Sequence, residues 1–204
     1  MQIHEPATLI TDYLLAVLAL VLAILLGRRS PPVARARHWF TWALALIGLS
    51  AAIGGSYHGF APNFGEPASG IWWWFTLLTL MLVSAALAHS LTLELTSGSG
   101  QPFVRAAILF KLVSFAAFAV NKPLFLVAIV GYGITLLAWL AAALAGHRPW
   151  KRDMLTAIAL SGIAAAVQQL QLAPSHVFNH NDLYHVIQAF ALMAFYRAGR
   201  RLSF

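Results

Sequence analysis

The chain contains no cysteine and few charged residues. Without cysteine it can form neither disulfide bonds nor thiolate metal sites. Only 9% of its 204 residues are charged, whereas a soluble domain carries about 25%. Hydrophobic residues make up 60% of the chain. These proportions argue against the water-facing surface of an ordinary soluble domain and indicate a chain that lies in a membrane.

Seven apolar segments are long enough to cross a membrane, which takes about 20 helical residues. They span Ala7–Gly27, His38–Phe60, Ile71–Leu95, Phe103–Asn121, Pro123–Ala145, Met154–Leu172 and Asn181–Gly199. The fourth is the weakest, because Arg105 and Lys111 interrupt it. We expect Lys111 to reach back toward the cytoplasmic side or to pair with Glu94. The sequence thus predicts an all-α integral membrane protein, a single bundle of seven transmembrane helices covering residues 1–204.

Basic residues gather in alternate connections, so that they all fall on one side of a seven-helix bundle. These are Arg28, Arg29, Arg35, Arg37, Arg105, Arg148, Lys151, Arg152, Arg197, Arg200 and Arg201. The other connections hold Lys122 beside Glu5, Glu66 and Asp182. Because basic connections stay in the cytoplasm, we predict the N-terminus outside and the C-terminus in the cytoplasm of a bacterial-type inner membrane. The net charge of +7 is therefore a topology signal and does not indicate a nucleic-acid partner.

Polar residues also gather near the predicted outer ends of four helices. They include Asp12, Ser56, His58, Gln168, Gln169, Gln171, His180, Asn181, Asp182 and His185. Ionisable groups at membrane depth are costly and usually face a cavity or a partner. The outer cluster is therefore the candidate site. Asp12 is either a partner of this cluster or a residue that reaches the membrane surface.

The segment from His180 to His185 has the spacing of a metal site. Residues 182 and 185 share a helical face, whereas 180 and 185 lie about 140° apart at ~100° per residue. His180 can reach the same point if the helix begins at Asn181. Neutral imidazoles suit zinc, and a catalytic zinc keeps three protein ligands and one open position. We predict zinc bound by His58, His180 and His185, with Asp182 as the alternative third ligand.

The triplet Ser56-Tyr57-His58 and the pair Tyr184-His185, in a seven-helix layout, resemble the CREST superfamily. That superfamily includes alkaline ceramidases, progestin and adipoQ receptors and hemolysin III-like proteins. The resemblance implies zinc held by one His of helix two and two of helix seven, and hydrolysis of lipid amides.

The sequence departs from the superfamily pattern at three places. Asn181 stands where the first His of helix seven is implied, and Gly54 stands where a Ser is implied. The implied Asp of helix three has no counterpart, because no acidic residue occurs from Pro67 to Leu93. The general base would then be Asp182 or Glu66.

We therefore predict a zinc-dependent hydrolase of a lipid amide or ester, with its site near the periplasmic face and a membrane lipid as its substrate. Asp182 and Ser56 are the candidate catalytic residues. One alternative is a sensor or receptor in which the metal is structural. A further alternative is a b-type cytochrome, with haem between His58 and His185 or between His38 and His89.

Overall fold

The computed structural model describes residues 1–31, 33–96 and 101–203, and this part of the chain is all-helical, without a strand. The α helices are α1 (Pro6–Arg28), α2 (Arg35–Phe60), α3 (Ala68–Leu95), α4 (Gln101–Asn121), α5 (Phe125–Leu144), α6 (Lys151–Gln169) and α7 (His180–Gly199). A short 3-10 turn, η1 (Ala61–Asn63), follows α2. Each of the seven predicted segments coincides with one of these helices, so the all-α fold class is confirmed.

Five of the helices described are long and apolar enough to cross a membrane. They are α1, α2 together with η1, α3, α4 and α5. The last two predicted segments fall outside this group because both helices start with polar residues. Helix α6 begins with Lys151, Arg152 and Asp153, and α7 begins with His180, Asn181 and Asp182.

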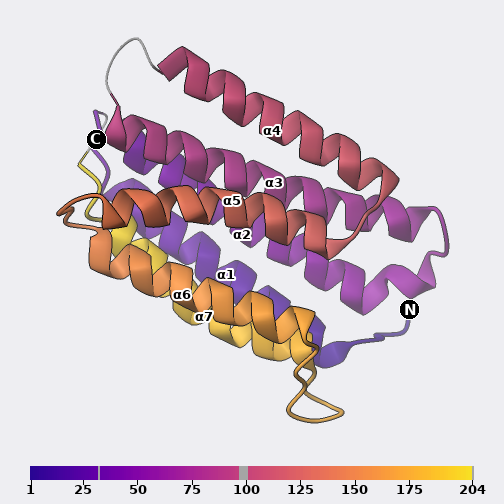
Figure 1. Cartoon of the computed structure of the whole chain (residues 1–204). Coiled ribbons are helices and arrows are strands. Elements are labelled where there is room, and N and C mark those ends of the chain that lie inside the picture. Colours follow the sequence, from indigo (N-terminus) through magenta and orange to yellow (C-terminus); the bar gives the residue numbers. More distant parts are fainter. Residues whose placement is uncertain (32, 97–100, 204) are drawn as a thin grey trace.

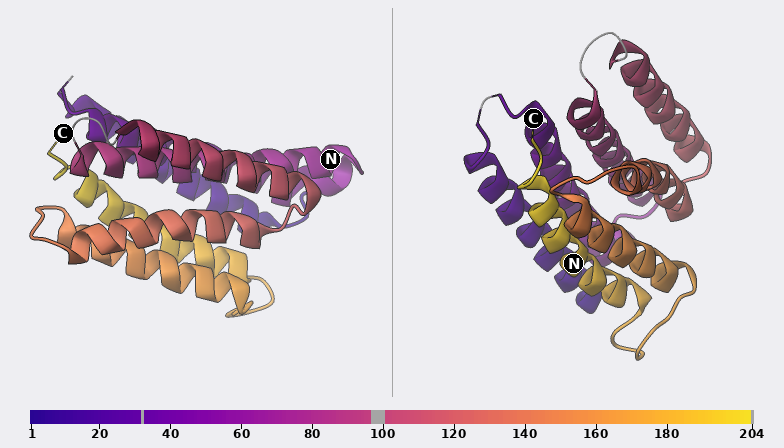
Figure 2. Two further views of the ribbon diagram at one scale, coloured as in Figure 1. Left: turned by 45° about the horizontal axis from the view of Figure 1, so that its top comes forward. Right: turned by 60° about the vertical axis from the view of Figure 1, so that its left-hand side comes forward.

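Six helices form a closed ring, in which α1 packs on α2, α2 on α3, α3 on α5, α5 on α6, α6 on α7 and α7 on α1. Helix α4 lies outside this ring against α3 and α5 (Figures 1 and 2). The two chain termini lie at opposite ends of the bundle (Figure 1). We refer to these as the N-terminal end, which holds η1 and the start of α7, and the C-terminal end. The ring positions α1, α2 and α7 side by side.

Aromatic side chains fill the ring toward its C-terminal end. The Phe40 and Trp139 rings are 5.8 Å apart, and the Trp139 and Trp150 rings are 5.1 Å apart, each pair edge to face. These three side chains are fully buried. The Trp150 indole donates a hydrogen bond of 2.9 Å to the Glu94 carboxylate. The C-terminal end is therefore closed by packed rings whose polar N–H groups are satisfied.

Lys111 attaches the peripheral helix α4 to the ring. Its Nζ donates hydrogen bonds to Ser84 Oγ (2.7 Å), Gly131 O (3.2 Å) and Thr135 Oγ1 (2.5 Å). These contacts differ from both expectations from the sequence, which were a side chain that reaches toward the cytoplasmic side or one that pairs with Glu94. The difference arises because Ser84 and Thr135 offer oxygen acceptors beside Lys111, midway along α3 and α5. An ammonium that donates to three oxygens needs no carboxylate partner for its hydrogen bonds.

Candidate functional site

A cavity of about 260 Å³ lies inside the ring, toward its N-terminal end. Each surrounding helix contributes one face to it. On α2 these residues are Ile47, Ser50, Ala51, Gly54 and His58, whose spacing is that of a single helical stripe. The ionisable lining residues and two amides gather at the end nearer the N-terminus: Asp12, His58, Gln168, His180, Asn181 and His185. Neutral polar side chains also line the cavity: Ser50, Thr76, Tyr132, Tyr184 and Gln188. The deeper lining is mainly apolar: Ile47, Leu80, Val83, Leu192 and Phe195.

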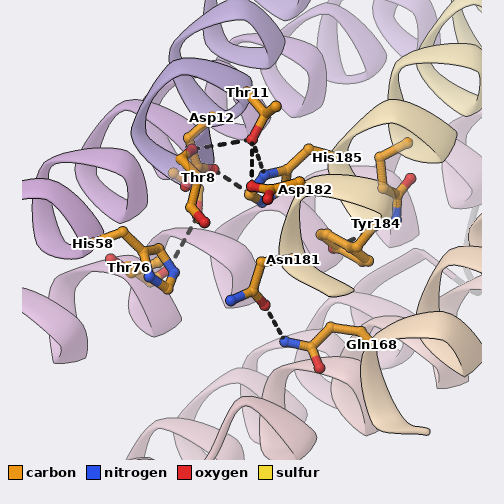
Figure 3. A network of polar contacts seen from close by, with 12 residues as sticks. Thr8, Thr11, Asp12, His58, Thr76, Gln168, Asn181, Asp182, Tyr184 and His185 are labelled. Atoms are coloured by element: carbon orange, nitrogen blue, oxygen red, sulfur yellow. Dashed lines mark hydrogen bonds and ion pairs between the residues drawn. The ribbon is translucent and has the colours of Figure 1, made fainter. Parts of the chain in front are cut away.

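The three predicted zinc ligands, His58, His180 and His185, all line the polar end of this cavity. Within residues 1–31, 33–96 and 101–203, however, no group of three or more His, Asp or Glu is placed so that it could hold a metal ion. Figure 3 shows Asp12, Asp182 and His185 gathered around Thr11, with the His58 ring apart from them. The structure thus brings the predicted residues to one cavity end without bringing them into one coordination sphere.

Both ring nitrogens of His185 already have partners. Nε2 lies 3.1 Å from Asp12 Oδ1, and Nδ1 lies 3.0 Å from Thr11 Oγ1 (Figure 3). If Asp12 is ionised it can only accept a hydrogen bond, and His185 would then carry its proton on Nε2 and accept from the Thr11 hydroxyl at Nδ1. His185 is therefore held between two residues of α1.

Asp12 belongs to the cluster, which decides between the two roles left open by the sequence. Its residue surface is only 4% exposed, and it lines the cavity. While Oδ1 contacts His185, Oδ2 is buried and has no hydrogen-bond partner among the described residues. Asp12 is thus a carboxylate that lines the cavity, although it is not one of the predicted catalytic residues.

Asp182, a predicted catalytic residue, serves the start of α7. It is fully buried, and its Oδ2 accepts a hydrogen bond of 2.7 Å from the backbone N–H of Asn179. The Asn179 side chain in turn accepts from the N–H groups of Asn181 and Asp182. This reciprocal arrangement is a capping box. Helix α7 accordingly begins at His180, and Asp182 is not among the described residues that line the cavity.

Ser56, the other predicted catalytic residue, faces α1 instead of the cavity. Its hydroxyl donates to Ala52 O at 2.8 Å and is hydrogen-bonded to the Tyr13 hydroxyl at 2.9 Å. It is not among the described lining residues. The structure assigns Ser56 to the contact between α1 and α2.

His58 lies between the inner cavity and a second hollow of about 350 Å³, because it lines both. Glu5 and Glu66 line the outer hollow. Glu5 Oε2 lies 3.3 Å from His58 Nδ1, and the His58 imidazole beside it lowers the pKa of the Glu5 carboxyl below its ordinary value. Glu66 accepts a hydrogen bond of 2.8 Å from Ser69. The Glu5–His58 pair thus stands at the junction of the two spaces.

The fold and the cavity define a class: an all-helical bundle with several helices of membrane-crossing length around a cavity that has one polar and one apolar end. The chain belongs to the family described as "Family of unknown function (DUF6962)", which matches residues 7–203. Neither the curated proteins nor the solved structures gave a match to the chain.

Proposed function

We propose that this chain crosses a bacterial-type inner membrane seven times, with its N-terminal end in the periplasm, and hydrolyses an amide or ester bond of a lipid held in the cavity. The observation that carries the proposal is the lining of the cavity, which has imidazole and carboxylate groups at one end and, farther in, mainly apolar side chains with a few neutral polar ones such as Ser50 and Gln188.

The depth and volume of the cavity suit one hydrocarbon chain. Along α2, the 11 residue steps from His58 to Ile47 correspond to about 16 Å at ~1.5 Å per residue. That depth is close to half of a hydrocarbon core that is ~30 Å thick. A dry cavity of about 150 Å³ holds one benzene molecule, so 260 Å³ suits one chain and not two. A lipid with a single acyl chain is therefore the favoured substrate.

The polar end of the cavity supports chemistry beyond simple binding. Burying ionisable side chains at membrane depth is costly, and such groups usually mark functional sites. Asp12 and His185 form a carboxylate–imidazole pair there, and His58 stands beside the outer hollow. A lipid carbonyl at this end would meet hydrogen-bonding and proton-transferring groups, and water could approach past His58.

Zinc bound by His58, His180 and His185 stays a prediction. Imidazole ligands suit zinc, but the placement of these residues does not hold a metal ion in the described parts of the chain. His185 would have to leave Asp12 or Thr11 to offer a nitrogen. We therefore assign no step of the proposed reaction to a metal.

The test is hydrolysis by the purified chain of a fatty amide and of the matching fatty ester, with free fatty acid measured by mass spectrometry. We expect release by the wild type and at least a tenfold loss in His185→Ala. His38→Ala is the control, because His38 lies in the first turn of α2 at the opposite end of the bundle. Stoichiometric zinc together with loss of activity in chelator would confirm the zinc prediction. Lipid binding without release would contradict hydrolysis and favour the sensor or receptor alternative.

A further inference from the structure

We propose that Asp12 is the general base of the hydrolysis, the group that takes a proton from the attacking water. This inference rests on the proposed function and assigns to α1 a role that the sequence had given to Asp182 or Glu66. It is carried by the position of one carboxylate oxygen, Asp12 Oδ2.

Asp12 Oδ2 is a buried acceptor that the protein leaves without a hydrogen-bond partner in the described structure. The Asp12 side chain is only 6% exposed, and it lines the cavity. Leaving a buried carboxylate oxygen unsatisfied is costly, so such an oxygen usually has a partner that enters the site. Because Oδ2 itself is buried, a water molecule or a substrate N–H or O–H group would reach it when the Asp12 side chain turns toward the cavity that the residue lines.

Two glycines of α2 make room for Asp12. A Cβ atom at Gly55 would lie 2.7 Å from the Asp12 Cβ, so α1 can approach α2 this closely only where α2 lacks a side chain. A Cβ atom at Gly54 would lie 3.9 Å and 4.0 Å from the two carboxylate oxygens. Gly54 also lines the cavity, so the Asp12 carboxylate lies beside a part of the cavity wall that has no side chain.

The other carboxylates near this end of the bundle are engaged elsewhere. Asp182 caps α7, Glu5 pairs with His58, and Glu66 accepts from Ser69. Among the described residues that line the inner cavity, Asp12 is the one carboxylate. It is therefore the base that a lipid carbonyl in the cavity would meet.

The reaction balances with the residues present. The water oxygen attacks the carbonyl carbon, and its proton passes to Asp12 Oδ2. The carbon–nitrogen or carbon–oxygen bond then breaks, and the leaving amine or alcohol takes the same proton from Asp12. The products are a fatty acid and an amine or alcohol. His185 keeps Asp12 oriented throughout through the contact between Nε2 and Oδ1, 3.1 Å apart.

The test compares Asp12→Asn with Asp153→Asn in the purified full-length chain, using the fatty amide substrate. Asp12→Asn keeps the shape of the side chain but removes the base, so we expect kcat to fall about 100-fold or more while KM stays within threefold. Asp153→Asn is the control, because Asp153 lies 3.2 Å from Arg201 at the opposite end of the bundle and its substitution should leave kcat unchanged. A merely structural role of Asp12 would not produce this separation of kcat from KM.

The outcomes separate this inference from the proposed function. A wild type that releases no fatty acid contradicts the proposed function itself. A wild type that is active together with an Asp12→Asn variant of equal kcat overturns the role of Asp12. If Asp12→Asn fails to fold, Asp12→Glu decides: it keeps the charge but moves the carboxylate, so kcat should fall at least tenfold. An unchanged kcat in Asp12→Glu would then overturn the inference.

Discussion

Gly55→Ala is expected to lower the thermal midpoint of the purified protein by about 2–12 °C. The added Cβ would lie 2.7 Å from Asp12 Cβ and 3.2 Å from Tyr13 Cδ1. Because the Asp12 Cβ is attached directly to the backbone, it cannot move away without shifting α1. Overpacking of this kind costs about 1–3 kcal/mol, and each kcal/mol corresponds to about 2–4 °C in a chain of this size. Thermal unfolding in detergent measures the effect, and lipid hydrolysis should fall with it because Asp12 is displaced.

The matched control for this substitution is Gly162→Ala on α6. A Cβ at Gly162 would meet nothing within 4 Å. Replacing a helical glycine by alanine where there is room stabilises by about 0.5–1 kcal/mol, so the midpoint should stay equal or rise. Equal midpoints for Gly55→Ala and Gly162→Ala would show that α1 and α2 do not depend on the close approach at Gly55.

Ala51→Phe is expected to reduce binding of a radiolabelled single-chain fatty amide at least tenfold. Ala51 lies between Ile47 and Gly54 on the α2 stripe that lines the cavity, so a phenyl ring there would occupy the space assigned to the acyl chain. Since the ring would fill an existing cavity, the thermal midpoint should change little or rise. Equilibrium binding to the purified protein measures the loss.

Leu49→Phe is the control for Ala51→Phe. Leu49 lies on the same helix but is 49% exposed on the outside of the bundle. The Leu49→Phe variant should bind the fatty amide with the affinity of the wild type. If Ala51→Phe also binds with unchanged affinity, the lipid chain does not enter the cavity along α2.

The positions of the helices could be predicted from the sequence because long apolar runs have few alternatives. The segment predicted as Ala7–Gly27 is α1 (Pro6–Arg28), and that predicted as Asn181–Gly199 is α7 (His180–Gly199). The convergence of His58, His180 and His185 on one cavity also agrees with their predicted depth. Depth follows from position along a helix of known direction, so residues at equal depth can be grouped without a structure.

The sequence does not show in the same way which face of each helix packs against which neighbouring helix. Ser56 is only two residues from His58 but faces Tyr13, and Asp182 is three residues from His185 but caps α7. The capping role had a signal in the sequence, since Asn179 precedes Asp182 by three residues at the start of a helix. The pairing of Asp12 with His185 joins residues 173 positions apart, and it depends on α7 closing the ring beside α1.

Photo-crosslinking with a single-chain fatty amide tests the central claim most directly. Two probes are compared, one with a diazirine at the end of the chain and one with a diazirine beside the carbonyl. If the chain lies in the cavity with its carbonyl at Asp12, the first probe labels Ile47, Leu192 or Phe195, which line the deep end. The second probe labels Trp73 or Tyr184, which lie nearer the polar end. Labelling confined to outward-facing residues such as Leu14 and Val17, which are 65% and 61% exposed, would contradict the account.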